Sequence, residues 1–168
     1  VAVAKACEDA GADGLSLINT MLGMRIDLKT KKPVIANTMG GFSGPAIFPV
    51  AVRMVYQVAK AVNIPVIGLG GIASATDAIE FIMAGASAIE IGTANFLDPA
   101  ISAKVAQGIN HWLDAHNIAS VRDIIGVDSL GYLSCENAHK LAENTEGFCT
   151  ACFDGKYPCT PPRVPDKT

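Results

Sequence analysis

The sequence has few charged residues, and its positive charges do not cluster. Only 17% of its residues are Asp, Glu, Lys or Arg, and the formal net charge is −3. Nucleic acids and anionic membranes attract clustered cations, so this composition argues against both as main partners. No apolar run reaches the roughly 18 residues of a membrane span, and the opening "VAVAKACEDAG" contains no export signal. These absences predict a cytoplasmic protein that binds neither nucleic acid nor a membrane.

The chain has enough apolar residues for one substantial domain. Half of its 168 residues are hydrophobic, which suits a single core with a possible appendage. The first residue is Val1 rather than Met, and it stands inside an amphipathic helical pattern. We therefore expect the natural start to lie upstream of this residue.

Cysteine is nearly absent from the first three quarters of the chain. Four of the five cysteines, from Cys135 to Cys159, lie beyond residue 126, which sets residues 127–168 apart from residues 1–126. Without an export signal, a disulfide framework is the less favoured interpretation of these cysteines. We expect an irregular, partly disordered tail that ends in the Pro-rich "TPPRVPDKT".

Up to residue 126, short apolar runs alternate with helical patterns. The runs predict strands over 14–19, 65–70 and 88–92, and helices over 1–12, 46–62, 75–85 and 102–117. Such alternation requires a parallel sheet covered by helices, as in a doubly wound sheet or a (β/α)8 barrel. A complete barrel takes about 250 residues, so if the fold is a TIM barrel, these three strands amount to at most its C-terminal half. Residues 24–38 are interpreted as an excursion from this order, with a small hairpin as one option.

A short repeat supports this division into β/α units. Ala10-Gly11-Ala12 precedes the first strand, and Ala84-Gly85-Ala86 precedes the last one. Glycine is the usual left-handed residue at a helix C-terminus, so each repeat predicts a helix end. Ser74 and Asp77 predict the start of the intervening helix, as an N-cap and a first-turn acid.

Two of the strands end in glycine-containing pairs, Gly70-Gly71 and Gly92-Thr93. At the C-terminal end of barrel strands, glycine lets main-chain N–H groups face a phosphate, and a Thr hydroxyl adds a donor. The alternative is that these glycines only terminate strands. Both interpretations stay open on the sequence alone.

Polar residues follow the first strand at Asn19 and Thr20. A carboxamide both donates and accepts, which suits a planar ring that carries carbonyl and N–H groups. The alternative is a turn in which Asn19 or Thr20 satisfies its own backbone. The glycine loop at residues 40–45 could close over a ligand or be a loop without contacts.

Taken together, "DGLSLINT", "ANTMGGFSGPAIFPVAVRMVYQVAKAVNIPVIGLGGI" and "DAIEFIMAGASAIEIGTANF" resemble the C-terminal half of a dihydroorotate dehydrogenase, in particular its NAD-linked soluble class. The resemblance covers about residues 1–126. It implies an FMN-containing barrel that oxidises dihydroorotate to orotate in pyrimidine biosynthesis, with a partner subunit that carries FAD and a [2Fe–2S] cluster. Other FMN-dependent pyrimidine oxidoreductases, and a non-catalytic remnant, remain alternatives.

The resemblance also implies roles for individual residues. Asn19 and Thr20 match substrate contacts. The matches to FMN contacts are Ile18, Gly44, Gly70, Gly71, Gly92 and Thr93. The catalytic base of the family belongs upstream of residue 1, and Cys7 does not replace it because it lies within a helix. We therefore expect the chain by itself to be inactive.

Residues 128–158 resemble a different family, the amidophosphoribosyltransferases, through "DSLGYLS" and "FCTACFDGKYP". In iron–sulfur members of that family a C-x-x-C pair serves a [4Fe–4S] cluster, which makes Cys149 and Cys152 weak metal candidates. Cys135 and Cys159 could complete a four-thiolate site. The favoured interpretation is a tail without metal.

Overall fold

The computed structural model describes residues 1–127 of the chain. Helices and strands alternate as the sequence predicts, except for an inserted group of four short strands. The elements in chain order are α1 (Ala2–Asp9), β1 (Leu15–Leu17), β2 (Met21–Gly23), β3 (Ile26–Asp27), β4 (Lys32–Pro33), β5 (Gly40–Phe42), the 3-10 turn η1 (Pro45–Ile47), α2 (Phe48–Ala59), β6 (Val66–Leu69), α3 (Ala75–Met83), β7 (Ala88–Glu90), α4 (Ala94–Leu97), α5 (Ile101–Ala115) and the 3-10 turn η2 (Val121–Ile124).

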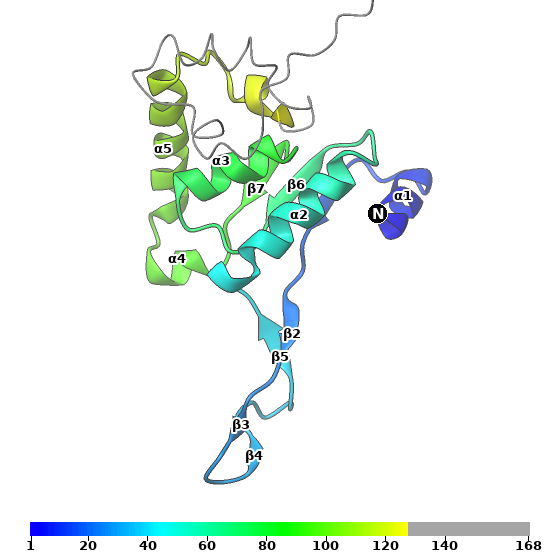
Figure 1. Ribbon diagram of the computed structural model, residues 1–168, viewed down its shortest axis with the longest axis vertical. Coiled ribbons are helices and arrows are strands. Elements are labelled where there is room, and N and C mark those ends of the chain that lie inside the picture. The colour runs from blue at the N-terminus through cyan, green and yellow to red at the C-terminus, as the bar shows by residue number, and fades with distance from the viewer. Residues whose placement is uncertain (128–168) are drawn as a thin grey trace, which may run out of the picture. The chain divides into compact units, whose positions relative to one another are not determined.

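The central sheet is parallel and has three strands in the order β1-β6-β7. Leu17 is paired with Gly68, and Leu69 with Glu90. Helix α2 connects β1 to β6 after the inserted strands, and α3 connects β6 to β7 (Figure 1). The predicted α/β class and the three parallel strands are therefore confirmed. Within the described residues the sheet does not close into a barrel, as expected of part of one.

The core lies between the sheet and helices α2 and α3. Val66 and Gly68 of β6 are buried, and Phe81 of α3 is fully buried beneath them. A Cβ atom placed on Gly68 would lie 2.4 Å from Phe81 Cδ1, so the aromatic ring needs a glycine in the strand. Phe81 also meets Phe48 edge to face, with ring centroids 5.5 Å apart, which is a favoured geometry for an aromatic pair.

Helix α2 buries a narrower stripe than its sequence indicates. Ala51, Val55 and Val58 are buried, as their helical spacing predicts. The i, i+3, i+4, i+7 spacing predicts that Met54 shares this face, but Met54 is 37% exposed and is not buried with the other three residues. Residues 51, 55 and 58 already fill the stripe that faces the sheet, and Met54 lies at its edge.

Local signals set the ends of the helices. Ser74 Oγ accepts a hydrogen bond from the N–H of Asp77, which confirms the predicted N-cap of α3. Gly11 and Gly85 have φ angles of 91° and 113°, in the left-handed region. The repeated Ala-Gly-Ala therefore ends α1 and α3 in the same way, as predicted.

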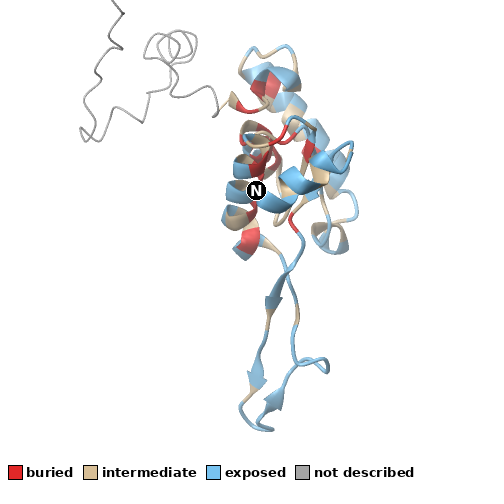
Figure 2. Ribbon diagram, turned by 90° about the vertical axis from the view of Figure 1, so that its right-hand side faces the viewer, coloured by how far each residue is buried: buried red, intermediate tan, exposed pale blue. Residues whose placement is uncertain are grey.

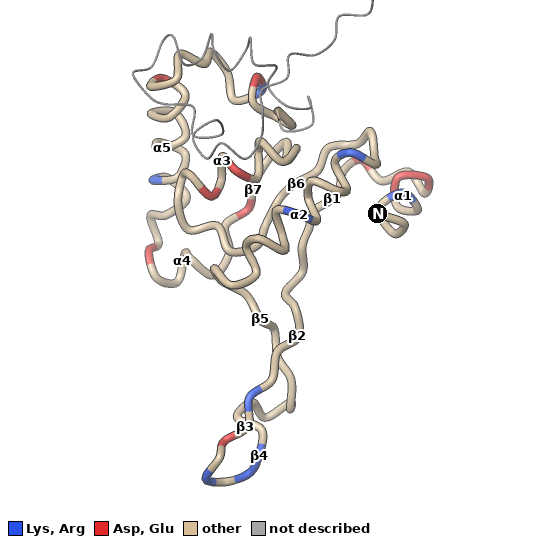
Figure 3. The backbone as a smooth tube through the Cα atoms, viewed as in Figure 1, with Lys and Arg blue, Asp and Glu red and all other residues tan. Residues whose placement is uncertain are grey.

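The excursion is larger than the predicted hairpin over residues 24–38. β2 pairs antiparallel with β5, and β3 pairs with β4 nearer the tip. Residues 21–42, here named the arm, extend away from the sheet (Figures 1 and 2). Figure 3 shows that basic residues gather at the arm's tip. Among residues 1–127, no helix is long and apolar enough to cross a membrane.

Candidate functional site

The predicted site residues follow the carboxyl ends of the three parallel strands. Gly70 and Gly71 come directly after β6, and Gly92 and Thr93 come shortly after β7. Ile18, Asn19 and Thr20 follow β1. Because β1, β6 and β7 run parallel, all three segments lie at one edge of the sheet. This edge, with the segments that follow it, is here named the rim.

The glycine loop after the arm reaches the same rim. Ser43 Oγ lies 3.3 Å from Thr93 Oγ1, within hydrogen-bond distance. The carbonyl oxygen of Gly44 lies 2.7 Å from the point where a Cβ atom on Gly71 would stand. The structure thus brings the loop at 40–45 against two glycine-containing pairs that are far from it in sequence.

Protein packing alone accounts for Gly70 and Gly71. Their φ angles are 134° and 81°, which side chains of L-residues rarely adopt. A Cβ atom on Gly70 would lie 2.8 Å from Ala51 Cβ, and one on Gly71 would meet Gly44 O. Packing therefore explains glycine at these two positions by itself, and the assigned contact of their main chain with FMN stays a prediction.

Gly92 and Gly44 differ from that pair. Apart from each glycine's own chain neighbours, no described residue has an atom within 4 Å of a Cβ atom built on either position. Gly44 has a φ of 91°, which explains why position 44 is a glycine, whereas the φ of Gly92 is not in the left-handed region. Neither packing nor backbone strain in the described residues requires glycine at position 92, and bare main chain with open space beside it fits the close approach of an anion.

The side chains of Asn19 and Thr20 contact each other. Asn19 Oδ1 accepts hydrogen bonds from the N–H and the hydroxyl of Thr20, at 2.7 and 3.3 Å. The Thr20 N–H is therefore satisfied by its neighbouring side chain, although residues 18–20 form no turn. Both residues are exposed, and the carboxamide nitrogen of Asn19 takes no part in this contact, so it can still face a ligand.

Ile18 is nearly buried, at 6% exposure, and its side chain belongs to the main core. Its N–H donates to the carbonyl oxygen of Leu69, at 3.0 Å, and so extends the β1–β6 pairing by one residue. A ligand at the rim would therefore meet the main chain of Ile18 rather than its side chain.

Asn95 fixes the segment that follows Gly92 and Thr93. Its Nδ2 donates to the carbonyl oxygens of Ile91 and Gly92, at 2.6 and 3.1 Å. Its Oδ1 accepts from the hydroxyl of Ser102, at 3.2 Å. Sequence reasoning missed both Asn95 and Ser43, although each stands close to an assigned glycine or threonine.

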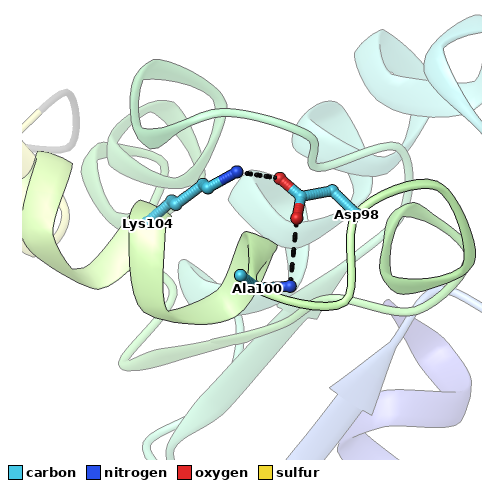
Figure 4. Close-up of polar contacts among 3 residues, drawn as sticks. All are labelled: Asp98, Ala100 and Lys104. Atoms are coloured by element: carbon cyan, nitrogen blue, oxygen red, sulfur yellow. Dashed lines mark hydrogen bonds and ion pairs between the residues drawn. The ribbon is translucent and has the colours of Figure 1, made fainter.

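The turn between α4 and α5 is held by a carboxylate. Asp98 accepts from Lys104 Nζ at 2.5 Å and from the N–H of Ala100 at 3.0 Å (Figure 4). These two donors hold the pKa of the Asp98 carboxyl below its ordinary value, and the hydrogen bond from Lys104 has the larger effect. The contact anchors α5 immediately after the rim segment.

The eight residues assigned to cofactor and substrate include no Lys or Arg. An anion bound by them would depend on main-chain N–H groups and hydroxyls. Among residues 1–127, no group of three His, Cys, Asp or Glu side chains could hold a metal ion. The weak metal candidates Cys149 and Cys152 lie outside the described residues, as does the segment that resembles amidophosphoribosyltransferases.

A parallel sheet with connecting helices and its candidate residues at the carboxyl edge defines part of a β/α-barrel protein. The chain belongs to the dihydroorotate dehydrogenase family, because a sequence model described as Dihydroorotate dehydrogenase matches residues 1–113.

Similar proteins agree with this assignment. The chain is 62% identical over 126 residues to the dihydroorotate dehydrogenase B (NAD(+)) catalytic subunit of Pelobacter propionicus, covering 75% of this chain and 41% of the relative. It is 60% identical over 124 residues to that of Bacteroides thetaiotaomicron, covering 74% and 41%. The chain thus spans about two fifths of the length of these curated relatives.

The fold is also similar to a solved structure. A crystal structure of DHODH from Eimeria tenella, in complex with ferulenol, superposes with a TM-score of 0.63 at 28% identity. The match covers 76% of this chain and 34% of the other. The three-stranded sheet therefore corresponds to part of a larger dihydroorotate dehydrogenase fold.

Proposed function

We propose that this chain is the C-terminal, flavin-facing part of a dihydroorotate dehydrogenase catalytic subunit, acting in pyrimidine biosynthesis. The observation that carries the proposal is the convergence of Asn19, Gly44 and Gly92, from separate segments, at one rim. Family membership supplies the substrate, dihydroorotate, and the product, orotate. When bound, FMN supplies the hydride acceptor for this oxidation.

The terminal phosphate of FMN is assigned to the gap beside Gly92 and Gly44. The open space at Gly92 supports this assignment, since neither packing nor strain in the described residues explains a glycine there. Thr93 adds a hydroxyl donor. Gly70 and Gly71 act here by shaping the rim, because Gly71 lets the Gly44 carbonyl approach β6.

The substrate ring is assigned to Asn19 and Thr20. The contact of Asn19 Oδ1 with the N–H of Thr20 fixes the carboxamide plane and leaves its nitrogen as a donor to a carbonyl group. Ile18 lies between these residues and β1, and its main chain would face the flavin.

The remaining parts of the reaction are assigned to other segments. The eight assigned residues include no general base, and we expect the base to lie upstream of residue 1 in the whole protein. The relatives are named as catalytic subunits of an NAD(+) enzyme. An electron-transfer subunit with FAD and a [2Fe–2S] cluster is therefore the proposed partner, in the cytoplasm.

A second candidate is a chain that holds flavin but catalyses nothing. The span of 41% of the relatives favours it, because a base and most of the barrel belong to the remaining length. Both candidates predict that the chain holds flavin, and one assay tests that shared prediction.

The purified full chain is mixed with FMN, and retained flavin is measured after gel filtration. Dihydroorotate is then added without oxygen, and bleaching of the flavin absorbance is followed. We expect FMN to be retained and not bleached. Bleaching would show that the chain supplies its own base, and failure to retain FMN would contradict the assigned phosphate site.

A further inference from the structure

Two hydroxyl groups from distant parts of the chain meet at the rim. Ser43 follows the last strand of the arm, and Thr93 lies 50 residues later, after β7. Their oxygen atoms are 3.3 Å apart, and either can donate. Both residues are exposed, so a ligand can reach them.

The hydroxyl of Thr93 does not cap the helix that follows it, although Thr93 stands at the N-cap position. Thr93 precedes α4 as its N-cap, and threonine at an N-cap commonly accepts from a main-chain N–H of the first turn. Its backbone is instead right-handed, with φ −54° and ψ −31°, and its side chain makes no capping bond. This hydroxyl contacts Ser43.

A pair of hydroxyls is suited to an anion. Together they hold two O–H donors, and their mutual hydrogen bond uses one. The oxygen that accepts within the pair keeps its own O–H free to donate outward. A hydroxyl that accepts one hydrogen bond also becomes a stronger donor in the next, because the bonds polarise one another.

The pair stands beside the two glycines with open space. Ser43 precedes Gly44, and Thr93 follows Gly92, and apart from such chain neighbours no described residue has an atom within 4 Å of a Cβ atom built on either glycine. An anion received by the main chain at these glycines would therefore lie next to both hydroxyls.

We propose that Ser43 is a positioning residue for the phosphate group of the flavin. Its hydroxyl donates to Thr93 Oγ1 and so directs the Thr93 O–H toward the phosphate. The inference rests on the proposed function, in which this rim receives FMN. It adds a residue that the assigned contacts do not include, and it gives the end of the arm a part in cofactor binding.

Flavin affinity separates this role from a structural one. FMN and riboflavin, which lacks the phosphate, are titrated against the full chain by fluorescence quenching, with Ser43→Ala and Ser43→Thr as the variants. Ser87→Ala is the matched control, because Ser87 is exposed and precedes β7 at the opposite edge of the sheet. Thermal unfolding of each variant monitors the fold.

We expect Ser43→Ala to weaken FMN about tenfold, as loss of an oriented donor to a charged group requires. Riboflavin affinity should not change, and Ser43→Thr should restore most of the FMN affinity. In the Thr93→Val background, Ser43→Ala should have no further effect on FMN. Equal losses for FMN and riboflavin, or no loss for FMN, would overturn the role of Ser43 and leave the proposed function standing.

If the unaltered chain binds no flavin, the cofactor assignment for this chain fails, and inorganic phosphate becomes the probe. Phosphate should then shift the NMR signals of the Gly92 and Thr93 amides, and Ser43→Ala should abolish the Thr93 shift. Shifts that are absent from the unaltered chain, or unchanged in Ser43→Ala, would overturn the inference as well.

Discussion

The sheet and the arm are built from the same chain by opposite means. All the buried hydrophobic residues of the described chain lie outside residues 19–46. Nine of its fourteen exposed large hydrophobic residues lie in the arm, from Met21 to Phe42. Figure 2 shows this division directly. Burial therefore stabilises the sheet and its helices, and it contributes little to the arm.

The arm must rely on local hydrogen bonds. Its two short ladders are antiparallel, and Asp27 Oδ1 accepts from the N–H groups of Lys29 and Thr30 at the tip. An isolated two-stranded hairpin is marginally stable in water. The comparison teaches that one end of the proposed site, Ser43 and Gly44, is attached to a weakly stabilised element, whereas the strands that end at the rim belong to a packed one.

Replacing a phenylalanine by alanine in each region should show the difference in packing most clearly. Phe81→Ala removes a fully buried ring from between the sheet and α3, and should lower the free energy of unfolding by about 3–5 kcal/mol. Phe42→Ala, at a residue 44% exposed in the arm, should cost about 1 kcal/mol or less. Urea denaturation followed by circular dichroism measures both. Equal losses would mean that the arm is packed as tightly as the core.

A smaller effect is expected where the two regions meet. Gly71→Ala forces a methyl group against the Gly44 carbonyl and Phe48 at a left-handed φ, and should destabilise by about 1–3 kcal/mol. Gly92→Ala meets no described atom, and should change stability by less than about 0.5 kcal/mol.

The same two glycines separate packing from binding. Gly92→Ala should weaken FMN about tenfold without affecting stability, since its methyl group enters the space assigned to the phosphate. Thermal unfolding and FMN titration of the two variants provide the measurement. If Gly92→Ala instead destabilises the protein and leaves FMN affinity unchanged, Gly92 has a structural role and does not contact the phosphate.

Capping groups allow a third test. Ser74→Ala removes the side-chain acceptor for the Asp77 N–H at the start of α3, and should cost about 1 kcal/mol of global stability. Asp27→Ala removes the acceptor at the arm's tip, and should speed hydrogen exchange of the Lys29 and Thr30 amides with little change in global unfolding. A global loss from Asp27→Ala would show that the arm and the sheet unfold together.

The smallest effect concerns two carboxyl groups, one in each region. Thr30 and Lys29 N–H groups lower the pKa of Asp27, and Lys104 and the Ala100 N–H lower that of Asp98, from an ordinary value of 3.8. A lowered folded pKa gives stability that is present above the unfolded pKa and is lost as the pH falls through the folded value. Both residues are only partly buried, so solvent screens these interactions and the change in stability should be slight.

Lys104→Met distinguishes the two carboxyl groups. It should raise the pKa of Asp98 toward 3.8, because the hydrogen bond from Lys104 is the largest cause of the lowered pKa of Asp98. It should leave the pKa of Asp27 unchanged, because Lys104 is not among the groups that lower it. Carboxyl NMR shifts followed against pH measure both values. A shift at Asp27, or none at Asp98, would contradict the assigned causes.

Much of the packed region was predictable from the sequence. The helix ends at the Ala-Gly-Ala repeats and the helix start at Ser74 depend on residues close together in the chain, so the local sequence predicts them. The position of the glycine-containing pairs at one edge follows from strands that run parallel. The arm was underestimated, because Met21 pairs with Phe42, far along the chain, and no periodic pattern marks that pairing.

The sequence by itself determined the α/β alternation, the helix ends and the family, because these follow from short-range periodicity, turn chemistry and motifs in order. Only the tertiary structure decided that a side chain at position 71 would clash with the Gly44 carbonyl oxygen. It also decided that packing does not explain the glycine at position 92, and that the hydroxyl groups of Ser43 and Thr93 lie within hydrogen-bond distance. These facts depend on which atoms approach one another across long stretches of chain, and no local pattern encodes such distances.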